Sequence, residues 1–319
     1  MFNLRLNARP VGRRDLASVM ALVMAATACD SASPTSPDDG PWGDPEFDFA
    51  AGAIAFESDR DGNREIYLMT VDGTDGINLT NHPATDGDIS WSPDGSRIAF
   101  ASDRAGNTEI YLMDVDGSNV TRITNDPAID RFPAWSPDGT RIAFASNRDG
   151  NFEIYAMDAT GLNELRLTRD PEDDTEPAWS ADGSRIIFQS ARTGNVDIWS
   201  MEPNGSTLIN LTADPSFDGA PATGTWSGSE GRISFVSDRA GGNMDIYTMT
   251  EDGSDVYRVT TAAELEFDSS WMVEGELLLF DSFRNGNWDI FVVEPSGAAT
   301  GRLTSHPADD ESPVWRPLP

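Results

Sequence analysis

The sequence predicts an all-β protein, a six-bladed β-propeller with four antiparallel strands in each blade. Three observations lead to this prediction. The block Trp91-Ser-Pro-Asp-Gly95, followed at once by Ser-Arg-Ile-Ala-Phe100, returns along the chain at a nearly constant spacing. Each period holds four short segments rich in strand-forming residues, separated by turn residues, and leaves no room for a helix. Four-stranded antiparallel units at a period of about 40–45 residues are typical of propeller blades.

The spacing is measured most clearly at the apolar residue that lies seven places after each Trp. The steps between successive copies are 44, 44, 44, 47 and 45 residues. In the first copy Phe47 stands in the place of the Trp. The six apolar positions are Ile54, Ile98, Ile142, Ile186, Ile233 and Leu278.

The unit that begins at Ile98 shows why each segment should be a strand or a turn. Two segments alternate apolar and polar residues, as half-buried strands do, and two are short apolar runs. Between them lie Gly106, the tight-turn pair Asp116-Gly117, Pro127, and a Ser-Pro-Asp-Gly sequence that suits a type I turn. The four expected strands are 98–101, 109–113, 120–124 and 132–135.

The last segment of the chain is expected to close the ring. After the sixth unit the sequence adds Ser312-Pro-Val-Trp315, which resembles an innermost strand without its partners. We expect Trp315 to lie beside Ile54–Phe56 and complete the first blade. Phe47–Ala50 is the rival closing strand, because it has the same seven-residue offset from Ile54.

These motifs resemble those of the TolB-like β-propeller family, within the wider WD-repeat-like group. The resemblance rests on WSPDG-x-x-IAF, then S-D-R-x-G-N-x-E-I-Y, then L-T, and covers Phe47 to Pro319. It implies the propeller fold strongly and a function only weakly. The namesake of the family, the periplasmic propeller of the Tol-Pal system, also carries an N-terminal α/β domain. Only about 18 residues separate Cys29 from Phe47, so we do not expect such a domain here.

Residues 1–28 are expected to form a signal peptide. Arg5, Arg9, Arg13 and Arg14 precede an uncharged apolar run, and Ala26-Thr-Ala28 is a small-residue cleavage site. The pattern resembles a bacterial lipobox, which implies that Cys29 is lipidated and becomes the first mature residue. Simple cleavage, giving a freely secreted protein, is the alternative. Residues 29–46 are rich in Ser, Pro, Asp and Gly and are expected to form a flexible tether to a propeller at 47–319. We therefore expect a lipid anchor at the cell envelope, facing the periplasm or the outer surface.

The charge of the chain restricts its partners. The net charge is −32, with 22 Lys and Arg against 54 Asp and Glu. Nucleic acids and anionic lipids are excluded as partners, because both need Lys and Arg contacts. Contact with a membrane is expected only through the N-terminal lipid. Cationic partners or metal ions are favoured, although an acidic exported protein is also simply soluble. The single cysteine excludes internal disulfides, and we expect a monomer.

An Arg and an acid bracket the first hairpin of every unit. Residues that flank a hairpin face each other, and a guanidinium can bind a carboxylate with two hydrogen bonds. Because every unit has the pair, we interpret it as structural. The expected ion pairs are Arg60 and Glu65, Arg104 and Glu109, Arg148 and Glu153, Arg192 and Asp197, Arg239 and Asp245, and Arg284 and Asp289.

A second set of acids precedes each innermost strand and is expected to ring one mouth of the channel. The set is Asp86, Asp130, Asp174, Asp218, Glu266 and Asp310. Further acids crowd the same segments, namely Asp88, Glu172, Asp173, Glu176, Asp268, Asp309 and Glu311. Such carboxylates could bind a basic peptide or Ca²⁺, which takes six to eight oxygens. The alternative is that each acid caps its own turn.

No motif for catalysis, a metal or a cofactor stands out. The two histidines, His82 and His306, hold the same place in units one and six, where units two, three and four have Asp126, Asp170 and Asp214, and repeat drift explains them. Apolar residues at the hairpin tips, Phe152, Met244 and Trp288, should share a face with the acidic mouth and offer a docking surface. We expect a non-catalytic protein- or peptide-binding module at the cell envelope. The alternatives are a carbohydrate-active enzyme and a passive surface scaffold.

Overall fold

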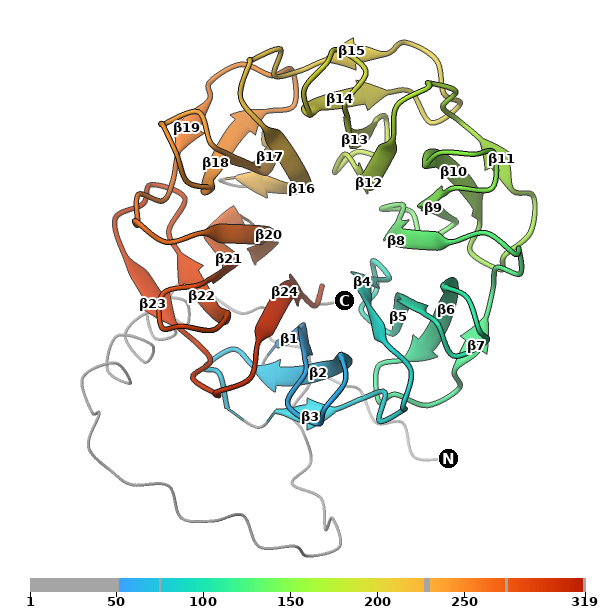
Figure 1. The fold of residues 1–319 in the computed structure, drawn as a ribbon, viewed down its shortest axis with the longest axis horizontal. Helices are drawn as coiled ribbons and strands as arrows, with labels where there is room; N and C mark the ends of the chain where they lie inside the picture. The colour runs from blue at the N-terminus through green and yellow to red at the C-terminus, as the bar shows by residue number, and fades with distance from the viewer. Residues whose placement is uncertain (1–51, 75, 227–229, 273–274, 318–319) are drawn as a thin grey trace, which may run out of the picture.

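In a computed structural model, described here for residues 52–317 other than 75, 227–229 and 273–274, the chain forms a ring of six antiparallel sheets (Figure 1). Each sheet has four strands and the six sheets are arranged around a central axis, so the predicted six-bladed propeller is confirmed. We call the region along this axis, lined by the innermost strands, the central channel. In the described residues no helix is long and apolar enough to cross a membrane. The predicted signal peptide, tether and Cys29 lie outside the described residues.

The strands of each blade follow one another from the channel to the rim, except in blade 1. Blade 1 contains β24 (Asp310–Trp315), β1 (Ala53–Ser58), β2 (Glu65–Thr70) and β3 (Ile77–Asn78). Blade 2 contains β4 (Asp86–Trp91), β5 (Arg97–Ser102), β6 (Glu109–Asp114) and β7 (Thr121–Arg122). Blade 3 contains β8 (Asp130–Trp135), β9 (Arg141–Ser146), β10 (Glu153–Asp158) and β11 (Leu165–Arg166). Blade 4 contains β12 (Asp174–Trp179), β13 (Ile186–Ser190), β14 (Asp197–Met201) and β15 (Ile209–Asn210). Blade 5 contains β16 (Asp218–Trp226), β17 (Glu230–Ser237), β18 (Asp245–Thr250) and β19 (Tyr257–Arg258). Blade 6 contains β20 (Glu266–Met272), β21 (Leu277–Ser282), β22 (Asp289–Val293) and β23 (Thr300–Arg302).

The ring closes as predicted, with β24 as the innermost strand of blade 1. Ile54 pairs with Trp315 and Ala55 pairs with Val314 in an antiparallel register. The backbone N–H of Arg316 then donates to the carbonyl of Ala53 at 3.0 Å. The rival strand Phe47–Ala50 lies outside the described residues, and β24 fills the slot for which it competed.

The core consists of six apolar clusters, each packed between two neighbouring blades. Between blades 2 and 3, for example, Ile110 and Leu112 pack against Phe144 and Met157. The Phe of every Ile-x-Phe strand is fully buried, and each such ring contributes roughly 1.5–3 kcal/mol. The sheets are therefore held face to face by the same residues that produce the repeat in the sequence.

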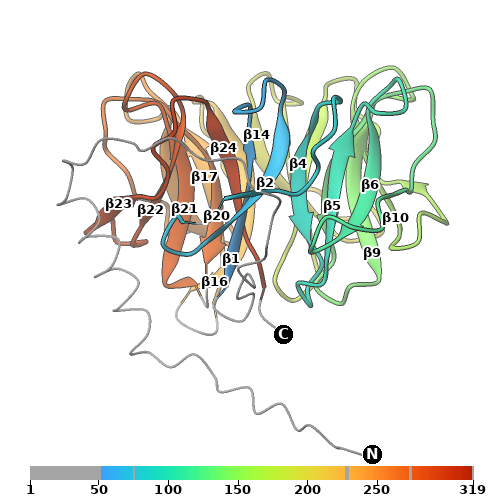
Figure 2. The ribbon, with the colours of Figure 1, turned by 90° about the horizontal axis from the view of Figure 1, so that it is seen from below.

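The Asp-Gly turns bring neighbouring blades into backbone contact. Gly117 has φ of 79°, and a Cβ atom at this position would lie 2.4 Å from the carbonyl oxygen of Leu79 in the preceding blade. Glycine is required here both for the left-handed backbone and for the close approach. The turns lie on the face opposite the first hairpins, whose tips form the upper edge in Figure 2.

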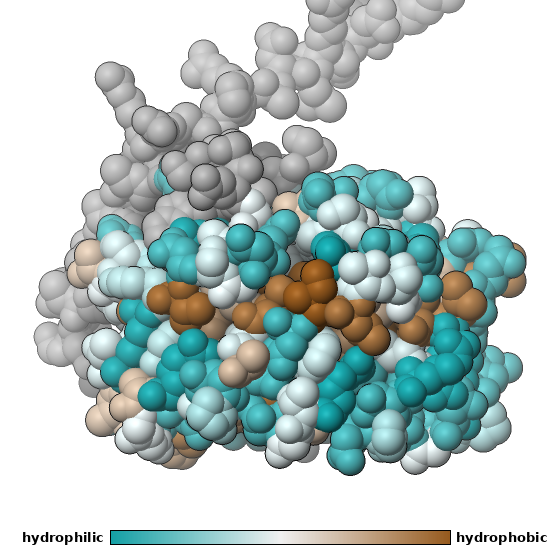
Figure 3. Space-filling model, turned by 90° about the horizontal axis from the view of Figure 1, so that it is seen from above, coloured by the Kyte–Doolittle hydropathy of each residue, from teal (hydrophilic) through white to brown (hydrophobic). Residues whose placement is uncertain are grey.

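Part of the rim is apolar along its middle. Figure 3 views the ring from the side of β15 and shows a band of apolar residues across it. The exposed apolar side chains on or beside the outer strands include Leu165, Ile209 and Tyr257, which are between 41% and 49% exposed. The outer strands are two or three residues long, so each offers little edge for pairing with another chain.

Candidate functional site: the central channel

The hairpin arginines do not bind the acids predicted for them. Arg104 donates from Nη2 to both carboxylate oxygens of Asp86, at 2.9 and 2.8 Å, and not to Glu109. It folds back over Ser102, whose Oγ accepts from Nε at 2.9 Å, and its guanidinium lies over the rings of Phe100 and Tyr111. Ser102 pairs across the sheet with Asp86 on one side and Glu109 on the other, so the Arg had two carboxylates within reach.

All six blades repeat this arrangement. The predicted pairs Arg60–Glu65, Arg104–Glu109, Arg148–Glu153, Arg192–Asp197, Arg239–Asp245 and Arg284–Asp289 are therefore wrong. The observed pairs are Arg60–Asp310, Arg104–Asp86, Arg148–Asp130, Arg192–Asp174, Arg239–Asp218 and Arg284–Glu266. In each pair the guanidinium bridges the innermost strand and the hairpin of one blade, which indicates a structural role.

The same pairing corrects the prediction of an acidic mouth built from these six acids. Their side chains are completely buried, at 0% exposure, and each is bound by its own blade's Arg. A partner in the channel cannot reach them. The corrected positions are Asp86, Asp130, Asp174, Asp218, Glu266 and Asp310.

The acids that begin the second strands bind outward, to the outermost strand. Glu109 accepts from the Oγ1 of Thr124 at 2.7 Å and from the guanidinium of Arg122. Asp197 accepts from the amide of Asn210 at 2.9 Å. Arginines also hold Glu153, Asp245 and Asp289, through Arg166, Arg258 and Arg302. These contacts fix the short outer strands to their blades.

A bulge in every innermost strand creates a second ring of side chains deeper in the channel. In blade 2, Gly87 pairs with Ala101 but Ser90 pairs with Ala99, so the register shifts in between. The third residue of each innermost strand has a left-handed backbone, with φ between 42° and 54°. A non-glycine residue in this region is strained by about 1 kcal/mol or more. The six bulge residues are Asp88, Phe132, Glu176, Ala220, Asp268 and Ser312.

Acids occupy alternate places around this ring. Asp88, Glu176 and Asp268 belong to blades 2, 4 and 6, and non-acidic residues stand between them. Each acid reaches the bulge of the next blade. The backbone N–H of Phe132 donates to Asp88 at 3.3 Å, and the hydroxyl of Ser312 donates to Asp268 at 2.8 Å.

Three polar side chains on the neighbouring strands support the bulges from behind. Glu57 accepts from the N–H of Asp88 at 2.6 Å, and Gln189 accepts from that of Ala220 at 3.0 Å. Asp281 accepts from the N–H of Ser312 at 2.9 Å. Sequence reasoning missed Glu57, Gln189 and Asp281. The signal was present, because the same repeat position is Ala or Val in the other three blades.

The channel cluster contains more acidic than basic groups. Six carboxyl groups, of Glu57, Asp88, Glu176, Asp268, Asp281 and Glu311, lie near two guanidiniums, those of Arg64 and Arg131. Glu57 and Asp281 are themselves buried, at 3% and 2% exposure, behind the other four. Arg64 binds Glu57 at 3.0 Å and also Glu311, and Arg131 binds Asp88 at 3.0 Å. The remaining acids have no cation bound to them by an ion pair among the described residues. The acids of this cluster therefore outnumber the arginines that bind them.

The titration of these acids follows from their burial and mutual repulsion. Burial, followed by the nearby charge of Asp88, raises the pKa of Glu57 to about 8. Burial and then the charge of Asp268 raise the pKa of Glu176 to about 8. Burial and Asp268 also raise the pKa of Asp281 well above its usual value. In the absence of a bound cation, the channel holds protons near neutral pH.

Four of the additional predicted acids, Asp88, Glu176, Asp268 and Glu311, lie in this channel cluster. Of the others, Asp173 accepts from the N–H of Phe152 and Asp309 from the N–H of Trp288, so these two cap hairpin tips. Glu172 is exposed. The tip residues Phe152 and Met244 are half-buried against core clusters, and the half-buried Trp288 packs on neighbouring aromatic rings.

The two histidines occupy turn-capping positions. The Nδ1 of His82 accepts from the N–H of Ala84, and the Nδ1 of His306 accepts from the N–H of Ala308, both at 3.1 Å. Asp126 makes the same contact with Ala128 in blade 2. Across the described residues, no three His, Cys, Asp or Glu side chains converge in a way that could hold a metal ion.

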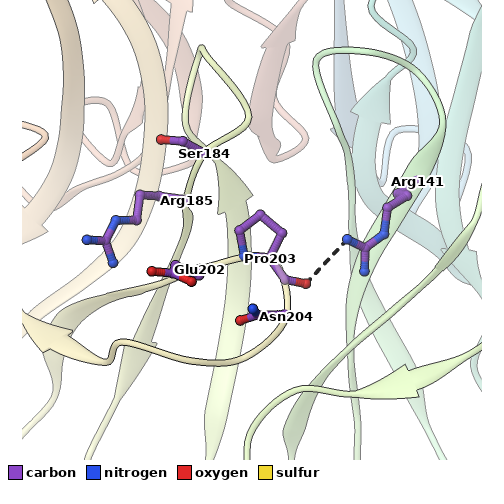
Figure 4. A pocket seen from close by; sticks show the side chains of 6 residues that line it. All are labelled: Arg141, Ser184, Arg185, Glu202, Pro203 and Asn204. Atoms are coloured by element: carbon purple, nitrogen blue, oxygen red, sulfur yellow. Dashed lines mark hydrogen bonds between the residues drawn. The ribbon is translucent and has the colours of Figure 1, made fainter.

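A separate cleft opens between blades 3 and 4, on the side of the Asp-Gly turns (Figure 4). Its volume is about 520 Å³ and it is lined by Arg141, Ser184, Arg185, Glu202, Pro203 and Asn204. Arg141 donates to the carbonyl of Pro203 at 3.3 Å across the cleft. None of the predicted site residues lines it.

Comparison with known proteins identifies the family. Residues 20–131 and 124–214 match the family described as TolB beta propeller domain. The Tol-Pal system protein TolB of Syntrophus aciditrophicus is 37% identical over 87 residues, which are 25% of this chain and 19% of that protein. The TolB of Desulfosudis oleivorans is 28% identical over 95 residues, 30% of this chain and 21% of that protein. The matches thus span about a fifth of the length of these relatives.

The crystal structure of TolB from Acinetobacter baumannii superposes with a TM-score of 0.73 at 23% identity, over 84% of this chain and 67% of that one. This likeness concerns the fold. The repeat, the ring of six sheets and the family match agree, and the chain belongs to the TolB beta-propeller domain family.

Proposed function

We propose that this protein is a non-catalytic binding module of the cell envelope whose central channel takes a cationic segment of a partner protein. The observation that carries the proposal is the excess of acidic over basic groups in the channel cluster, where six carboxyl groups lie near two guanidiniums. The raised pKa values indicate that these acids hold protons. A lysine or arginine side chain would replace those protons and relieve the repulsion between the carboxylates.

The family supports a role in protein binding. Its curated relatives are named as proteins of the Tol-Pal system. The strained, non-glycine bulge residues give further support, because such strain is found at binding sites more often than in passive scaffolds. No nucleic acid is expected to bind, since the chain has a large excess of acids.

The experiment must separate the channel from the general negative charge of the molecule. A basic peptide, acetyl-(Arg-Gly-Leu)₃-amide, is titrated into three proteins by calorimetry at 150 mM salt. The first is unchanged, the second carries Asp88→Asn, Glu176→Gln and Asp268→Asn, and the third carries Glu172→Gln, Glu264→Gln and Glu276→Gln at exposed positions. With every acid ionised, the two triple variants have the same formal net charge. We expect the channel variant alone to lose binding, and equal binding by all three would refute the proposal.

We also propose that the protein is exported and anchored by a lipid on Cys29, as a monomer without a cofactor. The basic lead, the apolar run and the small residues before Cys29 support this. Metabolic labelling with an alkyne fatty acid should mark the unchanged protein and not a Cys29→Ala variant. An unlabelled protein released into the medium would favour simple cleavage instead.

A further inference from the structure

The face of blade 6 beside the channel carries a group of apolar side chains that the other blades lack. Phe267 lies on β20, Phe283 and Trp288 lie on the first hairpin, and Leu265 precedes β20. Trp288 packs edge to face on Phe267, with ring centroids 5.9 Å apart, and on Phe283, at 5.4 Å. Phe283 and Leu265 are exposed by 41% and 42%. We call these four residues the blade 6 platform.

The platform replaces a polar contact that other blades keep. In blade 2, Asp103 stands where Phe283 stands in blade 6, and it accepts from the backbone N–H of Thr85 at 2.9 Å. The equivalent residues in blades 1, 3 and 5, Asp59, Asn147 and Asp238, make the same contact. Blade 6 is the one blade in which all four equivalent positions are apolar. The exposed ring of Phe283 therefore stands where four other blades have a side-chain hydrogen bond.

Two carboxylates of the channel cluster adjoin the platform. Asp268 follows Phe267 along β20, and Asp281 is the cross-strand partner of Phe267. Both converge on Ser312, because Asp268 accepts its hydroxyl at 2.8 Å and Asp281 accepts its N–H at 2.9 Å. The other oxygen of Asp281, Oδ1, is buried without a hydrogen-bond partner in a side chain that is only 2% exposed. Buried polar atoms normally have a hydrogen-bond partner, so this oxygen marks a place beside a second acid where a donor is missing.

We propose that the junction of blades 6 and 1 is an arginine subsite, where Asp268, with Asp281 behind it, binds a guanidinium and the blade 6 platform holds the apolar residue next to that arginine in the partner segment. The inference rests on the proposed function, since it names the part of the channel that does the recognition. Arginine suits the junction better than lysine, because its planar group binds a carboxylate with two hydrogen bonds and stacks on aromatic rings. Charge and apolar surface lie side by side here, and the partner must present both.

The test uses the full chain labelled with 5-fluorotryptophan, with the Trp288 signal assigned from a Trp288→Phe variant. Three small probes are titrated: acetyl-Leu-Arg-amide, the same compound with neutral citrulline in place of arginine, and acetyl-Gly-Arg-amide. We expect the Leu-Arg probe to shift the Trp288 signal, the citrulline probe to leave it unchanged, and the Gly-Arg probe to bind several-fold more weakly. The variants Asp268→Asn and Phe283→Ala should each weaken Leu-Arg binding by about tenfold.

Matched controls decide among the outcomes. Ile129→Ala changes the exposed apolar residue at the place of Leu265 on blade 3, across the ring, and Glu172→Gln removes one exposed charge outside the channel. Both should leave the affinity unchanged. If Phe283→Ala and Asp268→Asn have no effect while Asp88→Asn weakens binding, the subsite is refuted and the proposed function stands. If the citrulline probe binds as well as the arginine probe, both are refuted. Thermal unfolding of each variant confirms that it is folded.

Discussion

Arg104 binds both oxygens of Asp86 from a single nitrogen, within one blade, and the carboxylate is fully buried. Removing one partner from a buried ion pair leaves an uncompensated charge, and this loss is larger than the net worth of the pair itself. The six copies of the contact are thus a structural feature, and their strength can be measured blade by blade.

The Asp86→Ala variant should lower the free energy of unfolding by about 3–5 kcal/mol. Urea unfolding followed by circular dichroism measures the change. The paired variant Asp86→Leu with Arg104→Met should be destabilised by much less, because no charge is left without a partner. A loss below about 1 kcal/mol for Asp86→Ala would contradict a buried structural pair.

Substitution of Gly117 by Ala should destabilise the protein more than substitution of Gly106. Both glycines have positive φ, 79° and 101°, so both variants suffer the same kind of backbone strain. Only at Gly117 would the new Cβ meet another blade, 2.4 Å from the carbonyl oxygen of Leu79, whereas nothing lies within 4 Å at Gly106. We expect a difference of at least about 1 kcal/mol in urea unfolding. Equal effects would mean that the blades adjust to the extra atom.

The protein should become less stable as the pH rises from about 6 to 8.5. Glu57 and Glu176 have pKa values near 8 in the folded chain and near 4.5 when unfolded. Between these values the folded state binds more protons than the unfolded state, so the free energy of unfolding falls with increasing pH. The groups that act on Glu57 are Asp88, Arg64 and Asp268, and all remain ionisable in the test. The Glu176→Gln variant should show a flatter pH dependence of its urea midpoint, and an unchanged slope would contradict the raised pKa.

Deletion of residues 310–319 should abolish the single cooperative unfolding transition. The deletion removes β24, which leaves β1 as an open edge and uncovers the cluster formed by blades 1 and 6. The variant Val314→Thr tests the same strand mildly and should keep the transition at a lower midpoint. A truncated chain that unfolds like the full one would show that closure contributes little.

The sequence predicted the architecture because the repeat is carried by residues whose roles are local. Ile98, Phe100 and the Asp116-Gly117 turn identify strands and turns by composition alone, and Trp315 showed where the ring closes. The pairing of Arg104 could not be predicted in the same way. Asp86 and Glu109 both flank Ser102, and only the direction in which the side chain folds back decides between them.

The sequence predicted that acids would gather in the channel, but not which acids would do so. The sequence pointed to acids on the innermost strands, and Asp88 and Asp268 do lie in the cluster. The bulge could not be foreseen. A one-residue shift in strand register changes the direction of a side chain, but it does not require particular residue types in the sequence. Glu57 and Asp281 could have been found by asking where an acid replaces the Ala or Val of other blades.

The pairing of β24 with β1 also affects how the chain folds. Arg60 and its partner Asp310 are 250 positions apart in the sequence, so blade 1 is complete only when the two ends of the propeller meet. Such distant pairing slows folding, since most of the entropy of the chain must be lost before the last contacts form. Until β24 pairs with it, one side of β1 stays open to any extended strand, and closure of the ring removes this edge from pairing with other molecules.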